Sequence, residues 1–220
     1  MSSQQQLTRS AVHIECGLVP YTEGLRLQHE WHAKVVAGFV DGVILSLEHP
    51  AVITFGRHAE PKHLHRDTAS LAAEGVPVIA TERGGEVTAH MPGQLVIYPI
   101  LPLGAWGMGV RSYVGRLERS VIDLLHRYGL ESQTREGYPG VWLGHAKICA
   151  VGIRVKSRTS LHGIALNICN DLSLFSAMMP CGIAGASVTR MADHLAEAPG
   201  VLSILPNLIQ SLRENLQIGS

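Results

Sequence analysis

A cysteine stands between a proline and a glycine in the segment MMPCGI, at position 181. Cys149 in KICAVGIRV and Cys169 in IALNIC lie in apolar runs, as cysteines held only for packing usually do. Cys181 lies in a turn instead, where backbone N–H groups can stabilise an oxyanion. Because a thiolate is a strong nucleophile, this position predicts a reactive cysteine.

Lys147 begins the strand-like run KICAVGIRV. Side chains alternate across a strand, so we expect Lys147 to share the apolar face of Cys149 while Arg154, Lys156 and Arg158 lie on the other face. Desolvation lowers the pKa of a buried lysine, which would make such an amine a base near neutrality. The alternative is a side chain at the end of the strand that extends into solvent, and alternation alone leaves both open.

The segment RGGEVTAHMPGQL, residues 83–95, contains two adjacent glycines and a proline–glycine pair. Glycines allow a backbone to approach a ligand closely, and Arg83 and His90 add polar groups. A glycine-rich turn without a ligand remains the alternative. The segment is not a phosphate-binding loop of the GxxxxGK[ST] type, because the lysine and the hydroxyl are missing.

His162 and Gly163 interrupt the apolar strand SLHGIALN. A histidine in this position is more often a hydrogen-bonded structural residue than a catalytic one. The glycine beside it favours close approach by another backbone or by a ligand.

Several histidines gather near residues 57–65 without carboxylates or cysteines at metal-ligand spacing. We interpret His58, His63 and His65 as surface histidines beside Arg57. The sequence therefore predicts no metal site and no cofactor.

These residues need a scaffold of strands and helices. Strands are expected at 43–47, 51–56, 76–82 and 94–100, and a helix is expected after Pro20. The runs at 141–144, 147–155 and 161–168 predict an antiparallel meander.

Apolar residues recur every three or four positions over 110–128, which predicts a helix that ends at Gly129. Its opposite face carries Arg116, Glu118, Arg119 and Asp123. A final amphipathic helix spans the leucines from Leu205 to Leu216. Helices beside a largely antiparallel sheet predict the α+β class. A doubly wound parallel sheet is less favoured, because regular crossover helices are missing.

The 220 residues fit a single domain, 1–220, and the 46% apolar content is ample for a core. Eighteen basic and eighteen acidic side chains cancel, which argues against a general binder of nucleic acid or of anionic membranes. No stretch resembles a signal peptide or a membrane span, so we expect a cytoplasmic protein. Four cysteines without a CxxC pair predict free thiols.

In this order, the motifs EHPAVITFGR, RGGEVTAHMPGQLVIYPI, GVWLGHAKICAVGIRV, SLHGIALN and DLSLFSAMMPCGI resemble those of the lipoyl(octanoyl) transferase family. The resemblance covers most of the chain. It implies the fold of biotin and lipoate protein ligases, a mixed sheet flanked by helices. It also implies that Cys181 and Lys147 are catalytic.

The same resemblance implies a set of substrate-binding residues. One group is an acyl-substrate loop formed by Arg83, Gly84, Gly85, Glu86, Val87, Thr88, Ala89 and His90. Further lining is implied at Ala150, Val151, Gly152, His162, Gly163 and Ile164. The family commonly has T-Y-H-G-P-G-Q where this chain has Ala89 and Met91, so the resemblance does not fix the acyl-chain length that is accepted.

The implied reaction moves an octanoyl group from octanoyl-acyl carrier protein to a lysine of a lipoyl domain through an acyl-cysteine thioester. The implied acceptors are the lipoyl domains of 2-oxoacid dehydrogenase complexes and the glycine cleavage H protein. Neither nucleic acid nor a membrane takes part. The face of Arg154, Lys156 and Arg158 could contact an acidic carrier protein, or it could be an ordinary solvated strand face.

Three other functions remain open. An ATP-dependent lipoate or biotin ligase of the same fold would need no cysteine nucleophile. A non-catalytic scaffold that binds lipoyl domains would need neither Cys181 nor Lys147. A cysteine hydrolase would pair the thiol with a histidine, for which His162 is the candidate.

Overall fold

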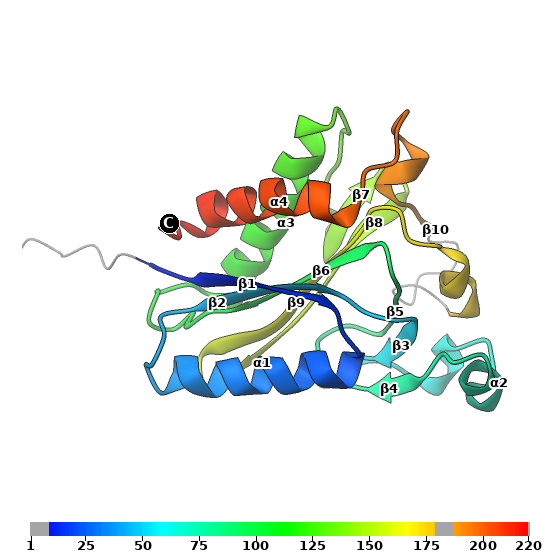
Figure 1. Cartoon of the computed structure of the whole chain (residues 1–220), viewed down its shortest axis with the longest axis horizontal. Coiled ribbons are helices and arrows are strands. Elements are labelled where there is room, and N and C mark those ends of the chain that lie inside the picture. The colour runs from blue at the N-terminus through cyan, green and yellow to red at the C-terminus, as the bar shows by residue number, and fades with distance from the viewer. Residues whose placement is uncertain (1–8, 179–186, 220) are drawn as a thin grey trace, which may run out of the picture.

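The computed structural model describes residues 9–178 and 187–219, which form a main sheet, a second small sheet and the helices that cover them (Figure 1). Within this part of the chain, the main sheet has seven strands in the order β1-β2-β6-β9-β8-β10, with β7 also paired to β8. Their bounds are β1 Val12–Leu18, β2 Val43–Glu48, β6 Gln94–Ile100, β7 Gly140–Leu143, β8 Ala146–Lys156, β9 Thr159–Asn167 and β10 Ser187–Val188. The pairs β1–β2 and β8–β10 are parallel, and the others are antiparallel.

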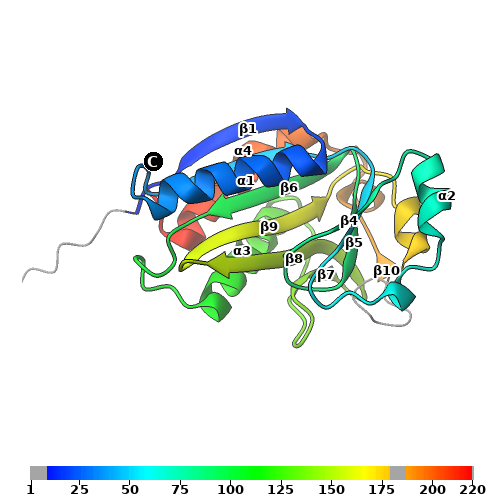
Figure 2. The same ribbon diagram turned by 90° about the horizontal axis from the view of Figure 1, so that it is seen from below.

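Helices cover both faces of the main sheet. Helix α1, Tyr21–Val36, lies on one face, and α3, Val110–Arg127, and α4, Val201–Leu216, lie on the other (Figures 1 and 2). The larger apolar core fills the space between the sheet and α3 and α4, because both helices present apolar residues at three- and four-residue intervals. A smaller core lies under α1.

The small sheet lies at one end of the main sheet, with the strand order β4-β3-β5 (Figure 2). Its strands are β3 Val52–Phe55, β4 Val78–Ala80 and β5 Val87–His90. A third core cluster packs it against helix α2, Thr68–Ala73, and the 3-10 helix Ser173–Ala177. Within residues 9–178 and 187–219, further 3-10 helices span Pro61–His63 and Met191–Asp193.

The prediction of a largely antiparallel α+β fold is confirmed, and so is the antiparallel meander of β7, β8 and β9. The strands expected at 51–56 and 76–82 belong to the small sheet. Strands β1 and β5 and helix α2 were not predicted. The units β1-α1-β2 and β3-α2-β4 are parallel crossovers, so the described part of the chain contains two such connections, contrary to the expectation that crossover helices are missing. Among the described residues, no helix is long and apolar enough to span a membrane.

Candidate active site

A cavity of about 390 Å³ lies between the loop before β5 and strand β8. Residues 83–88 line one side, and Ala150, Val151 and Gly152 line the other. Lys147 lines it as well. The cavity volume lies within the range of small-molecule sites. The structure therefore brings most of the predicted acyl-substrate loop to the same cavity as the predicted catalytic lysine.

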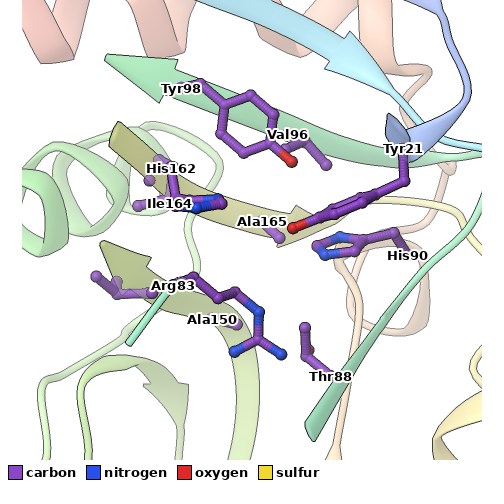
Figure 3. A pocket seen from close by; sticks show the side chains of 13 residues that line it. Tyr21, Arg83, Thr88, His90, Val96, Tyr98, Ala150, His162, Ile164 and Ala165 are labelled. Carbon is purple, nitrogen blue, oxygen red and sulfur yellow. The ribbon is translucent and has the colours of Figure 1, made fainter. Parts of the chain in front are cut away.

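A smaller pocket of about 50 Å³ shares Arg83, Thr88 and residues 150–152 with this cavity. His90 and residues 162–164 line the smaller pocket (Figure 3). In Figure 3 the ring of His162 points into the pocket from one side, and the rings of Tyr21 and His90 point into it from the other. All predicted lining residues except Ala89 thus belong to one of these two pockets.

Ala89 packs in the core of the small sheet together with Met91. Ala89 is fully buried, and Thr88 and His90 on either side of it line the pockets because β5 alternates. The thioether of Met91 accepts a hydrogen bond from Asn170 Nδ2 at 3.2 Å. The two positions that differ from the family pattern therefore adjust the packing behind β5.

Lys147 does not share a face with Cys149, so the prediction from strand alternation is wrong. Trp142 pairs with Lys147 while Val141 pairs with Cys149, which makes Ile148 an extra residue on β8. Such a bulge breaks the alternation of side chains. Ile148 and Cys149 both join the core, and Lys147 turns to the cavity beside Ala150.

Lys147 is 7% exposed, so its side chain does not extend freely into solvent. Its amine donates a hydrogen bond to the carbonyl oxygen of Pro139 at 2.8 Å. The same nitrogen lies 4.8 Å from the centre of the Trp142 ring, within cation–π range. A carbonyl and an aromatic face therefore hold the amine at the cavity wall.

Cys149 is unsuited to nucleophilic catalysis. Its side chain is fully buried, and burial raises the pKa of the Cys149 thiol to about 12 in spite of the nearby Lys147 charge. A thiol in that state forms little thiolate at neutral pH. Cys181, the predicted nucleophile, lies outside the described residues.

Arg83 joins the loop of the predicted substrate site to strand β3. Its Nε donates to Thr54 Oγ1 at 3.1 Å, and its Nη2 donates to the carbonyl oxygens of Thr54 at 2.6 Å and Glu86 at 2.7 Å. Nη1 donates to the carbonyl oxygen of Gly84 at 3.1 Å. These bonds fix the loop, so Arg83 supports the cavity wall from within.

Gly84 and Gly152 bring this loop against β8. Gly84 N–H donates to the carbonyl oxygen of Ile153 at 2.9 Å, and a Cβ at Gly152 would lie 3.0 Å from the carbonyl oxygen of Gly84. Gly163 shows the same feature on β9, since a Cβ there would lie 2.1 Å from the carbonyl oxygen of Ile97. The close approach expected at Gly163 is therefore made by another strand.

His90 is held by a chain of buried amides. Its Nδ1 lies 2.7 Å from Gln94 Oε1, while Gln94 Nε2 donates to Asn167 Oδ1 at 2.9 Å. Asn167 Nδ2 donates to the carbonyl oxygen of Thr189 at 3.0 Å. Because Gln94 Oε1 must accept, Nδ1 of His90 carries the proton. Burial holds the pKa of His90 well below its ordinary value, so Nε2 keeps its lone pair.

His49 and Tyr98 extend this aromatic cluster. His49 Nδ1 donates to the carbonyl oxygen of Val19 at 2.8 Å, which leaves Nε2 to accept from the Tyr98 hydroxyl at 2.9 Å. Burial lowers the pKa of His49 to about 4 and raises that of Tyr98 well above its ordinary value. Both groups are therefore neutral at physiological pH.

His162 has a strained backbone, with φ at 56°, and its N–H donates to Gln28 Oε1 at 2.7 Å. Burial and the Arg83 charge lower the pKa of His162 to about 3. Its Nδ1 is buried and makes no hydrogen bond to the described residues. A neutral imidazole with one unpaired nitrogen thus lines the smaller pocket.

His58 and His65 are exposed as expected, but the interpretation of His63 as a surface histidine is wrong, because His63 is buried with its Nδ1 3.8 Å from Glu86 Oε2. Within residues 9–178 and 187–219, no group of three metal-ligating side chains is found. His58 lines the cavity, and His63 Nδ1 accepts a hydrogen bond from the N–H of Glu60 at 3.3 Å.

The predicted basic face is less charged than its sequence suggests. Arg154 forms an ion pair with Glu82 at 2.8 Å. The Arg158 side chain packs close to Gly104. Lys156 is exposed.

Glu118 is a residue that sequence patterning misplaced. Its position on the polar face of the predicted helix indicated exposure, but Glu118 is 9% exposed and its Oε1 accepts a hydrogen bond from Gly140 N–H at 2.8 Å. In the sequence, only Gly140, directly before the run VWL, indicated that another group could approach the backbone closely at this point.

Comparison with known proteins places this site in a family. Residues 20–213 match the model of the lipoyl protein ligase A/B catalytic domain. An octanoyltransferase from Chloroflexus aurantiacus is 44% identical over 201 residues, which cover 90% of each chain. An octanoyltransferase from Chloroflexus aggregans is 43% identical and covers 93% of each chain.

Solved structures share the fold at low sequence identity. Lipoate-protein ligase A bound with ATP has a TM-score of 0.73 and 15% identity, covering 96% of this chain and 87% of that one. An archaeal bi-partite lipoate protein ligase from Thermoplasma acidophilum, studied with its E2 lipoyl domain, has a TM-score of 0.73 and 16% identity over 96% and 85%. Biotin protein ligase from Aquifex aeolicus has a TM-score of 0.52 and 11% identity over 96% and 70%. The chain therefore belongs to the octanoyltransferases of the lipoyl protein ligase A/B family.

Proposed function

We propose that this acyltransferase moves an octanoyl group from the thioester of an acyl carrier protein to a lysine of a lipoyl domain. The position of Lys147 carries the proposal, because its amine lines a cavity whose other walls come from the predicted acyl-substrate residues. The sequence similarity to octanoyltransferases supports the acyl group, and the similarity to a ligase studied with its lipoyl domain supports the acceptor.

Cys181 is the proposed nucleophile. Phe175 and Val188, described residues on either side of the segment that carries it, line a small pocket together with Lys147. Val188 also pairs directly with Lys147 along β10 and β8. Described residues that precede and follow Cys181 in the sequence thus lie beside the amine.

In the proposed reaction the Cys181 thiolate attacks the thioester carbonyl, a C–S bond to the enzyme forms, and the carrier thiolate leaves. Lys147 supplies the proton that the leaving thiolate takes. The acceptor amine then attacks octanoyl-Cys181, its C–N bond forms as the enzyme C–S bond breaks, and its surplus proton returns to Lys147. No ATP is consumed, because a thioester is already activated toward an amine.

Intact-protein mass spectrometry with octanoyl-carrier protein and no ATP tests this function. We expect a hydroxylamine-labile octanoyl adduct on the wild type and on Cys169→Ser, which alters an exposed cysteine other than the proposed nucleophile. Cys181→Ala should form none. A lipoyl domain added afterwards should discharge the adduct and gain the octanoyl mass, whereas loss of the adduct to water alone would indicate a hydrolase.

The similarity to lipoate-protein ligase A bound with ATP favours one second candidate, an ATP-dependent ligase. That enzyme would acylate the lipoyl domain from free octanoate and ATP. Product formation under those conditions, with no adduct from the carrier thioester, would replace the proposed transfer by ligation.

A further inference from the structure

Glu118 has no part in the proposed reaction, yet it lies buried beside the residues that hold Lys147. It comes from α3, whose Val114 one turn earlier lines the cavity, and its Oε1 accepts the Gly140 N–H bond at 2.8 Å. Burial raises the pKa of Glu118, whereas the Gly140 bond and the Lys147 charge lower it. A carboxylate is costly to bury, so its place here needs a compensating interaction.

Gly140 connects the carboxylate to the lysine. A Cβ at Gly140 would lie 3.1 Å from Lys147 Cε and 3.2 Å from Nζ, so the bare backbone of Gly140 forms a wall against the lysine side chain. Its φ of 133° is open to glycine and strained for other residues. Glu118 accepts a hydrogen bond from the N–H of Gly140 and thereby fixes the position of this backbone segment.

The residues on either side of Gly140 supply the remaining contacts of the amine. Pro139 provides the carbonyl oxygen at 2.8 Å, and Trp142 provides the aromatic face at 4.8 Å. Residues 139–142 therefore surround the Lys147 amine with a hydrogen-bond acceptor, a closely packed backbone and an aromatic ring. The aromatic face and the Glu118 charge both favour a positive charge on the amine over a neutral one.

We propose that Glu118 is a positioning residue for Lys147, which fixes residues 139–142 through Gly140 and holds the amine as an ammonium in the resting enzyme. The consequence for catalysis rests on the proposed function. An ammonium in this place would stabilise the thiolate of Cys181 and would be ready to protonate the leaving carrier thiolate. Glu118 from α3 and Cys149 from β8 are coupled electrostatically to Lys147.

The chain has only four lysines, at 34, 62, 147 and 156, so the Lys147 amine can be observed directly. Protein labelled with ¹³C at lysine Cε would be titrated by NMR, and Lys147→Arg would assign the signal. Glu118→Gln keeps an oxygen acceptor for Gly140 but removes the charge. We expect the Lys147 signal to change its titration in this variant toward lower pH, because the negative charge that favours the ammonium is gone.

The pH profile of single-turnover acylation should move in the same direction by a similar amount. Glu131→Gln is the matched control, because it removes the same charge from a side chain that is 88% exposed. It should leave the NMR midpoint and the profile unchanged. A purely structural role for Glu118 would lower the rate at every pH without moving either midpoint.

A folded Glu118→Gln protein with the wild-type Lys147 midpoint would overturn the proposal. If that variant does not fold, the wild type carries the test: ionisation of Glu118 at acidic pH must give a second step in the Lys147 signal, and its absence overturns the proposal. A wild type that shows the coupling but never forms an acyl adduct would refute the proposed function and leave the positioning role standing.

Discussion

Gly140 lies so close to Lys147 that a methyl group on the glycine would stand 3.2 Å from the amine nitrogen. The same methyl group would lie 2.5 Å from the carbonyl oxygen of Cys149. Any residue other than glycine at position 140 of β7 would therefore displace the Lys147 side chain.

Gly140→Ala should reduce acyl transfer at least tenfold, because the added methyl group displaces the Lys147 amine from its contacts. Overpacking and the positive φ should also lower the free energy of unfolding by about 2 to 3 kcal/mol. Single-turnover rates measured well below the unfolding temperature, together with urea unfolding, separate the two effects.

Gly144→Ala is the control for backbone strain alone. Gly144 also has a positive φ, 55°, but nothing lies within 4 Å of its Cβ position. This variant should lose about 1 kcal/mol of stability and keep its transfer rate. An equal loss of rate in both variants would refute the role assigned to Gly140.

Gly163→Ala should destabilise the main sheet, because the added Cβ would lie 2.1 Å from the carbonyl oxygen of Ile97 on the neighbouring strand. Backbone at the centre of a sheet cannot shift easily, so we expect a loss of about 2 to 3 kcal/mol in urea unfolding. Gly115→Ala, in α3 with open space around its Cβ, should instead gain up to about 1 kcal/mol. Unchanged stability of the Gly163 variant would contradict this account.

The sequence was sufficient for the elements with strong periodicity. Helix α3 and the β7–β8–β9 meander have regular apolar patterns, and the structure confirms them. Strand β5 was missed because it has only four residues and the glycines at 84 and 85 before it indicated a turn. Strand β1 was missed because it is an edge strand with mostly exposed or half-buried side chains.

The details of the site depended on features that no periodicity reveals. One extra residue, Ile148, reverses the face of Lys147 relative to Cys149. Helical spacing alone places Glu118 on the polar face of α3. Glu118 is buried instead, because its carboxylate accepts a hydrogen bond from the N–H of Gly140 on β7. The motif resemblance could identify the lysine, but the residues that hold it depend on tertiary contacts.

Lys156→Glu should weaken the interaction with an acidic carrier protein if the outer face of β8 contacts it. Lys156 is exposed, whereas the charge of Arg154 is already paired with Glu82 at 2.8 Å. At low salt we expect the apparent KM for the carrier-bound donor to rise about threefold or more, with kcat unchanged, because the substitution alters encounter at an exposed site. Octanoyl-pantetheine, which lacks the protein, is the control donor and should show no change; equal KM values for both enzymes with the carrier donor would exclude this face.

Stability should fall as the pH drops from about 6.5 toward 4, because His49 is buried in its neutral form. Its pKa is about 4 in the folded protein, below the ordinary value of 6.5, so the unfolded chain binds more protons between these values. Above pH 7 both states are neutral and the group has no effect. Complete protonation of the unfolded state would cost the fold up to about 3 kcal/mol from this residue.

Urea unfolding at pH 7.5, 6, 5 and 4 measures this dependence. His49→Gln should reduce the slope of the unfolding free energy against pH between 6.5 and 4 by the equivalent of about one bound proton. The lost hydrogen bonds to Val19 and Tyr98 should also lower stability at every pH. His126→Gln, which removes a histidine that is 74% exposed, should leave the slope unchanged. If His49→Gln keeps the full wild-type slope, the acid sensitivity arises elsewhere, and His162, with a pKa of about 3, becomes the next residue to test.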